Sequence, residues 1–132
     1  MTTVKLSKDL QNPRGVYSIP VTPFHEDGKL DIESLRKCIE FCLEKGAHGI
    51  VMPVNASEVA TLTDEERIKV IKEGSKVVNG SVHFVAGVTG NSVEQVKESI
   101  KIVEDVGVDS IITMPSTKVA SAQYVYDYFG DK

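Results

Sequence analysis

The sequence predicts an α/β fold in which helices alternate with the strands of a parallel sheet. Short apolar runs alternate along the chain with longer amphipathic segments, and glycine, proline or small polar residues stand at the junctions. Runs that are apolar throughout are typical of strands buried on both faces, as in parallel sheets. Alternation of such strands with helices requires crossover connections, which place neighbouring strands parallel to one another.

Four apolar runs are expected to form the strands, each bounded by turn-forming residues. They lie at residues 16–21, 49–54, 82–88 and 110–114. The first and second are expected to be buried on both faces. The polar residues 1–13 are expected to form an N-terminal arm, so that four βα units occupy residues 14–132 of a single domain.

Helix-capping patterns locate the expected helices between these strands. Asp31 has the type of side chain preferred at a helix N-cap. Thr63 with Glu66, and Ser92 with Gln95, match the capping box, in which two residues three positions apart satisfy each other's backbone N–H groups. The helices are expected to end near Gly46, Asn79-Gly80 and Gly107, and a fourth is expected to begin at Ser121.

Composition and charge exclude several classes of function. The chain has 132 residues, of which 41% are hydrophobic and 26% charged, values typical of a globular protein. The net charge is −4 and the basic residues form no run, which argues against a nucleic-acid partner. No apolar run approaches the roughly 18 residues of a membrane span, and the N-terminus has no apolar signal core. We therefore expect a cytoplasmic protein with no membrane partner, in which Cys38 and Cys42 are reduced core residues.

Two architectures fit the alternation of strands and helices: an open doubly wound sheet, and a closed barrel of which this chain supplies half. A doubly wound domain commonly carries a nucleotide or phosphate signature after its first strand. The sequence contains neither a Gly-x-Gly-x-x-Gly motif nor a Walker-type loop. The pattern of elements alone leaves both architectures open.

Polar residues follow the expected strands, where the functional groups of parallel α/β folds lie. Asn55, Ala56 and Ser57 follow the second strand, and small residues before a helix offer backbone N–H groups to an anion such as a carboxylate. The same loop also fits an ordinary βα turn, and the spacing does not decide between the two. Further contacts are expected at the ends of the first and fourth strands, from Thr22, Ser116 and Thr117.

Several motifs in the same order resemble the dihydrodipicolinate synthase and N-acetylneuraminate lyase family of class I aldolases. They are Thr22-Pro23-Phe24 after the first strand, Leu62-Thr63-Asp64-Glu65-Glu66-Arg67 at the second helix, Ala86-Gly87 in the third strand, and Met114-Pro115 at the fourth. The resemblance covers about residues 14 to 129. It implies that the chain forms the first four βα units of a (β/α)8 TIM barrel, that is, a half barrel.

The resemblance implies lyase chemistry on a 2-oxo acid such as pyruvate. In this family a lysine on the sixth strand forms a Schiff base, and a tyrosine on the fifth strand moves protons. Both would lie beyond Lys132, so we expect no catalytic residue in this chain and no activity from it alone. The substrate carboxylate would be held by Asn55, Ala56 and Ser57. No cofactor is implied, and no cluster of His, Cys, Asp or Glu has the spacing of a metal site.

Two departures from the family pattern indicate a divergent member whose substrate the sequence does not specify. The usual Gly-Thr-Thr-Gly-Glu loop reads Val54-Asn55-Ala56-Ser57-Glu58, so the hydroxyl of the second threonine is lost. The fourth strand ends in Pro115-Ser116-Thr117 in place of Pro-Tyr-Tyr, which removes a phenol that relays protons from a neighbouring subunit. Both changes argue against dihydrodipicolinate synthase itself.

A half barrel would leave its first and fourth strands as unpaired edges and turn apolar inner side chains to water. We therefore expect a homo-oligomer or a complex with a complementary half barrel. Two other functions remain open at this stage. One is a non-catalytic α/β module that binds small carboxylates or self-associates, and the other is a complete small doubly wound domain of unrelated function.

Overall fold

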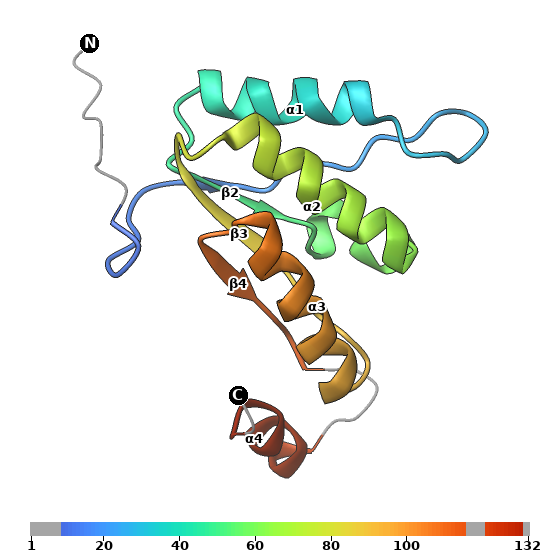
Figure 1. Ribbon diagram of the computed structural model, residues 1–132, viewed down its shortest axis with the longest axis vertical. Coiled ribbons are helices and arrows are strands. Elements are labelled where there is room, and N and C mark those ends of the chain that lie inside the picture. Colours follow the sequence, from blue (N-terminus) through green and yellow to red (C-terminus); the bar gives the residue numbers. More distant parts are fainter. Residues whose placement is uncertain (1–8, 116–120, 131–132) are drawn as a thin grey trace.

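A computed structural model describes residues 9–115 and 121–130, and it shows a parallel sheet with helices packed on it (Figure 1). The elements along the chain are β1 (Tyr17–Ser18), α1 (Ile32–Glu44), β2 (Gly49–Met52), α2 (Asp64–Val78), β3 (His83–Gly87), α3 (Val93–Val106), β4 (Ser110–Ile112) and α4 (Ala122–Gly130). Two short 3-10 helices, η1 (Asn55–Ser57) and η2 (Val59–Thr61), follow β2. The expected alternation of strands and helices is confirmed.

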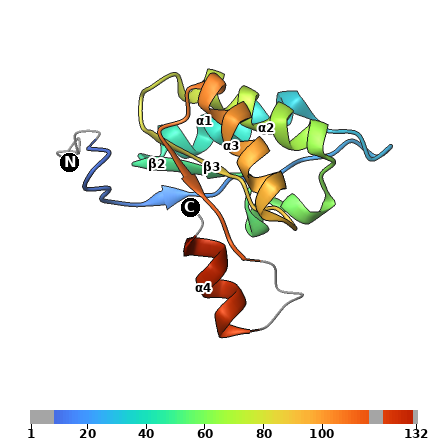
Figure 2. The ribbon, with the colours of Figure 1, turned by 60° about the horizontal axis from the view of Figure 1, so that its bottom comes forward.

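The strand order decides between the two architectures that the sequence leaves open. All neighbouring strands are parallel, and their order across the sheet is β1-β2-β3-β4, the same as along the chain. A doubly wound sheet reverses its strand order and carries helices on both faces. Here α1, α2 and α3 lie together over one face, while α4 lies apart from them, beyond β4 (Figure 2). This sequential arrangement is that of a barrel wall, so the expectation of a half barrel is confirmed.

The hydrophobic core lies between the sheet and the three helices that cover it. Side chains alternate along a strand, and Ile50 and Met52 point toward the helices beside Phe84 and Ala86 of the neighbouring strand. The helices contribute fully or almost fully buried side chains, including Leu35, Ile39, Val70, Val96 and Val103. Burial of each such side chain contributes roughly 1.5–3 kcal/mol. This layer is therefore what holds the helices on one face of the sheet.

The capping residues define the helix ends as expected, with one difference. The side chain of Thr63 accepts a hydrogen bond from the Glu66 amide at 3.2 Å, and the Glu66 carboxylate accepts one from the Thr63 amide at 2.8 Å. Ser92 accepts from the Gln95 amide, but the Gln95 side chain accepts from Asn91 rather than from Ser92. The expected reciprocal bond at Ser92 is therefore wrong. The backbone at Gly90 passes close to Gln95 and brings the Asn91 amide within reach.

The edge strands are shorter and more exposed than the sequence predicts. Only Tyr17 and Ser18 of the expected run pair with β2, and Val16, Ile19 and Val21 are 65%, 42% and 58% exposed. The expectation that this strand is buried on both faces is wrong, because β1 has a neighbouring strand on one side only. In contrast, every residue of β2 and β3, the two interior strands, is buried.

A hydrogen-bonded network that the sequence does not reveal joins three strands at their amino ends. The hydroxyl of Tyr17 lies 2.6 Å from Nδ1 of His83, and Nε2 of His83 lies 2.8 Å from Oγ of Ser110. Gly49 leaves the space that the Tyr17 ring occupies when its hydroxyl contacts His83, because a Cβ at position 49 would lie 2.7 Å from that ring. His83 is buried, so its two ring nitrogens depend on these hydroxyls as partners.

We predict that His83→Leu lowers the free energy of unfolding by roughly 1–3 kcal/mol, the cost of leaving partly buried hydroxyls without their partner. The change should appear as a lower urea midpoint. Lys37→Met, which removes an exposed ion pair with Glu33, is the control and should leave the midpoint almost unchanged. A His83→Leu chain that unfolds at the wild-type urea concentration would show that the network does not stabilise the fold.

Candidate carboxylate-binding site

A cavity of about 300 Å³ lies at the carboxyl ends of the strands. Val51 lines it and points away from the helices, because it alternates along β2 with Ile50 and Met52. The cavity is therefore on the sheet face that would be the inside of a barrel. It is lined by Ile19, Val51, Val54, Asn55, Ala56, Thr89, Ile112 and Met114. These residues come from all four strands or the segments that follow them.

The loop after β2 provides the polar end of this cavity. Gly87 lets the loop cross close to β3, because a Cβ at Gly87 would collide with the carbonyl oxygen of Pro53. Within the loop, the Ser57 amide donates to the Val54 carbonyl at 2.9 Å, and this bond forms the turn of η1. Asn55 and Ala56 stand exposed at the tip of that turn, where both line the cavity.

The structure separates the three residues that were expected to hold a carboxylate. Asn55 and Ala56 lie side by side in the cavity wall. Ser57 is fully buried outside that lining, and its amide is already bonded to Val54. Within the described part of the chain, the Ser57 hydroxyl has no hydrogen-bond partner. Asn55 and Ala56 are therefore the residues of this loop that can reach a bound molecule.

The contacts expected at the other strand ends have different positions. Thr22 is buried outside the cavity lining, and its hydroxyl donates to the Ser57 carbonyl at 2.6 Å. It thus ties the segment after β1 to the loop after β2. Ser116 and Thr117, which were expected to contribute from the end of the fourth strand, lie outside the described residues.

Thr89, which stands two residues after the end of β3, also lines the cavity, and its place after a strand is the sequence signal for this position. Its hydroxyl accepts a hydrogen bond from the Met114 amide at 3.1 Å. Its carbonyl accepts one from Nη1 of Arg67, also at 3.1 Å. Arg67 on α2 therefore positions Thr89, and Thr89 in turn positions the end of β4.

Among the described residues, none that lines this cavity is ionisable. A carboxylate bound there would be stabilised by neutral donors, the Asn55 side chain and the backbone N–H groups at the loop tip. Across the described ranges, no group of three or more His, Cys, Asp or Glu side chains could hold a metal ion. In the same ranges, no helix is both long and apolar enough to cross a membrane.

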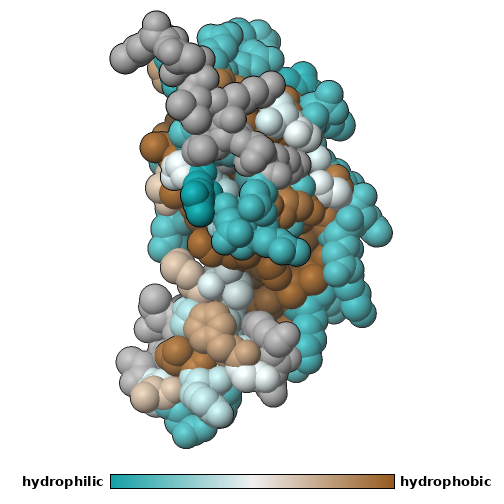
Figure 3. Space-filling view, turned by 90° about the vertical axis from the view of Figure 1, so that its left-hand side faces the viewer, coloured by the Kyte–Doolittle hydropathy of each residue, from teal (hydrophilic) through white to brown (hydrophobic). Residues whose placement is uncertain are grey.

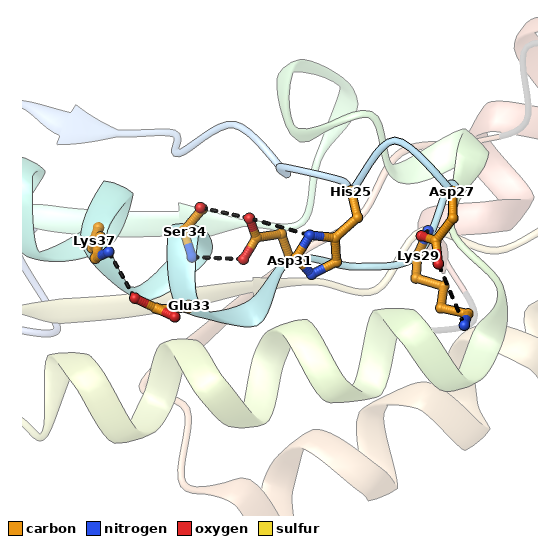
Figure 4. Close-up of polar contacts among 7 residues, drawn as sticks. All are labelled: His25, Asp27, Lys29, Asp31, Glu33, Ser34 and Lys37. Atoms are coloured by element: carbon orange, nitrogen blue, oxygen red, sulfur yellow. Dashed lines mark hydrogen bonds and ion pairs between the residues drawn. The ribbon is translucent and has the colours of Figure 1, made fainter.

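The segment between β1 and α1 is held by a small charged cluster (Figure 4). Asp31 accepts hydrogen bonds from the hydroxyl and the amide of Ser34, at 2.6 and 2.9 Å. His25 faces the same carboxylate at 3.8 Å. The Ser34 hydroxyl and then the Ser34 amide lower the pKa of Asp31 below its usual value, and the positive charges of His25 and Lys37 add to this effect.

Apolar side chains are also exposed on the surface. Figure 3 shows them gathered between the main body of the molecule and α4. Ile111, Ile112 and Met114, at the β4 edge of the sheet, are 40%, 42% and 37% exposed. The buried Tyr128 of α4 is hydrogen-bonded to Thr113 just beyond this strand. The exposure expected for the edge and inner face of a half barrel is therefore present.

The sequential parallel sheet, with loops and a cavity at its carboxyl ends, has the arrangement of a (β/α)8-barrel protein. The model of the dihydrodipicolinate synthetase family matches residues 12–131 of the chain. The chain therefore belongs to the dihydrodipicolinate synthetase family, as the motifs in its sequence indicated.

Relatives in two methanogens carry the name 4-hydroxy-tetrahydrodipicolinate synthase. The protein of Methanococcus vannielii is 42% identical over 99 residues, which cover 75% of this chain and 34% of the relative. The protein of Methanococcus maripaludis strain C6 is 36% identical over 119 residues, which cover 89% of this chain and 41% of the relative. The chain thus spans less than half the length of these curated relatives.

Solved structures of the family show the same wall of strands and helices. Dihydrodipicolinate synthase from Bacillus clausii superposes with a TM-score of 0.86 at 27% identity, over 92% of this chain and 42% of that one. The chloride-inhibited enzyme from Acinetobacter baumannii, complexed with pyruvate, gives a TM-score of 0.84 at 30% identity, over 91% and 42% of the two chains. The four βα units correspond to about two fifths of these barrels.

We predict that Ser34→Ala raises the pKa of Asp31 toward its usual value, because the Ser34 hydroxyl is the main cause of its lowering. A carboxyl group with a lowered folded-state pKa stabilises the fold above its unfolded value, near 3.8, and this stabilisation is lost as the pH falls through the lowered value. NMR titration of the Asp31 carboxyl carbon measures the change. Lys37→Met removes a minor cause and is the control. An unchanged Asp31 titration in Ser34→Ala would contradict the assignment.

Proposed function

We propose that this chain supplies the carboxylate-binding wall of a lyase that performs Schiff-base chemistry on a 2-oxo acid such as pyruvate. The observation that carries the proposal is the cavity at the carboxyl ends of β1 to β4, with Asn55 and Ala56 at its polar end. The pyruvate complex of the Acinetobacter baumannii relative supports a 2-oxo acid as the ligand class. We also propose that the protein acts in the cytoplasm.

The chemistry needs a protein amine, and no lysine is among the described residues that line this cavity. In such a reaction the amine attacks the keto carbon and water is lost, which leaves an imine. The protonated imine then accepts electron density from the neighbouring carbon, so no separate cofactor is required. We propose that four further βα units supply this lysine and the tyrosine that moves protons. The 132-residue chain alone would then bind its ligand without turning it over.

In this proposal the carboxylate accepts hydrogen bonds from the Asn55 side chain and the Ala56 amide. Ser57 has a supporting role: its carbonyl oxygen accepts a hydrogen bond from the Thr22 hydroxyl, and this bond keeps the loop in place. A contact of the ligand with the Ser57 amide would require the bond to Val54 to break. Thr22 is accordingly a supporting residue, and Ser116 and Thr117 remain proposed contacts from the end of β4.

We predict that pyruvate binds the chain weakly and that Asn55→Asp weakens this binding at least tenfold, because a second negative charge then faces the carboxylate. Titration by NMR measures the affinity. Asn79→Asp, an exposed position at the end of α2, introduces the same charge elsewhere and should leave binding unchanged. Borohydride treatment with pyruvate, followed by mass spectrometry, should yield no adduct on the chain alone. An adduct would contradict the assignment of the amine to other βα units.

A second function is favoured by the exposed inner face of the sheet. Ile19, Ile112 and Met114 line the cavity and are at least 37% exposed. Among the described strands, β1 and β4 each pair on one edge only. Apolar surface and free strand edges of this kind promote association. The chain would then be a non-catalytic module that binds small carboxylates and assembles with a second copy or a complementary half barrel.

We predict that the purified chain is a dimer or larger assembly by light scattering. Ile112→Lys, on the open edge strand, should shift it toward the monomer, because a charge would be buried in the contact. Phe41→Lys is the matched control: Phe41 is 58% exposed but lies on α1, on the opposite side of the sheet. A wild-type chain that stays monomeric and folded at high concentration would rule out self-association.

A further inference from the structure

We propose that Asn79 is a site of spontaneous covalent modification in the folded protein, where the backbone nitrogen of Gly80 attacks the side-chain amide and converts asparagine to aspartate and isoaspartate. Both residues are exposed in the connection between α2 and β3. This connection enters the amino end of β3, whereas the cavity lies at the carboxyl ends of the strands. The inference is therefore independent of the proposed function.

Residues 78–81 form a β-turn with a regular geometry. The amide of Ser81 donates to the carbonyl of Val78 at 2.9 Å, and this bond closes the turn. The two central residues both have positive φ, 45° at Asn79 and 70° at Gly80, and ψ of Asn79 is 44°. These angles are those of a type I′ turn, for which asparagine followed by glycine is a preferred pair.

The reaction forms a five-membered ring, so the Gly80 nitrogen must lie on the same side of the Cα–C bond as the Asn79 side chain. In the type I′ turn it lies on the opposite side. Half a rotation of the planar peptide between the two residues changes only ψ of Asn79 and φ of Gly80, and converts the turn to type II′. In a type II′ turn ψ of the first central residue is about −120°, which brings the nitrogen alongside Cβ. One peptide flip therefore reaches the reactive geometry.

The surroundings of the turn permit this flip. Within the described part of the chain, neither the carbonyl of Asn79 nor the amide of Gly80 makes a hydrogen bond, so the flip breaks none. The bond between Ser81 and Val78 lies outside the flipping peptide and is retained. Gly80 accepts the new φ because it has no Cβ, and no atom lies within 4 Å of the place where a Cβ would be.

The chemical step uses only solvent as co-reactant. The Gly80 amide gives its proton to hydroxide, and its nitrogen bonds to the side-chain carbonyl carbon of Asn79. The side-chain nitrogen takes a proton from water and leaves as ammonia, so that a succinimide ring remains. Water then opens the ring at either carbonyl and gives aspartate or isoaspartate. Both products place a negative charge at the carboxyl end of α2, where the helix dipole disfavours it.

Two other exposed asparagines are internal controls. Asn55 precedes Ala56 within η1, and Asn91 precedes Ser92, the N-cap residue of α3. Neither is followed by glycine, and neither has the positive φ that Asn79 has. A difference in rate between Asn79 and these two residues therefore reports on the turn and its glycine rather than on exposure.

The test follows the full chain in mildly alkaline buffer, either folded or unfolded in guanidinium chloride. Peptide mass spectrometry locates the loss of the amide, and an isoaspartyl methyltransferase assay detects isoaspartate. In the folded chain we expect Asn79 to react at least tenfold faster than Asn55 and Asn91, and no more than several-fold slower than in the unfolded chain. Asn79→Gln should remove the fast reaction, because glutamine would have to close a larger ring.

Three results would overturn the inference. Conversion of Asn79 in the unfolded chain but not in the folded one would show that the native turn protects the residue. Equal rates at Asn79 and Asn91 in the folded chain would show that the turn has no role. Absence of conversion at Asn79 in both states would show that the residue is not a modification site.

Discussion

Parallel pairing of consecutive strands is the constraint on which the rest of this structure depends. The register that joins Gly49 to His83 and Met52 to Ala86 gives β2 and β3 a common direction and a common pair of faces. One face packs under the helices and forms the core. The other carries Val51 and Val85 toward what would be a barrel interior, and the loops at the carboxyl ends meet around a single cavity. The position of the cavity thus follows from the parallel pairing of the strands.

The two ends of the sheet are held together by different kinds of contact. At the amino ends, His83 is hydrogen-bonded to Tyr17 on one side and to Ser110 on the other. The Tyr17 ring passes over Gly49 of the strand between them. At the carboxyl ends, the chain leaves the sheet in loops that are tied to one another by single bonds, such as the one from Thr22 to Ser57. This division is characteristic of barrels of alternating strands and helices, in which the loops after the strands can vary without loss of the framework.

The cavity combines a family framework with side chains particular to this chain. Gly87 allows the loop after β2 to approach β3, and Arg67 and Thr89 hold the rim between β3 and β4. Within that framework, Val54 and Ala56 stand where the family pattern has glycine and threonine, so the wall is less polar than the pattern predicts. Membership of the family is therefore compatible with different side chains in the loop after β2, because the framework and these side chains are different parts of the same wall.

The sequence by itself determined the order of strands and helices, the Thr63 capping box and the loop that carries Asn55 and Ala56. These features are encoded by residues a few positions apart, whose periodicity and hydrogen bonding are local. Tertiary structure decided the exposure of Val16 and Val21, the burial of Ser57 and the placement of Thr89 in the cavity. Each of these depends on which strand or loop lies alongside in space, and no local pattern records those neighbours.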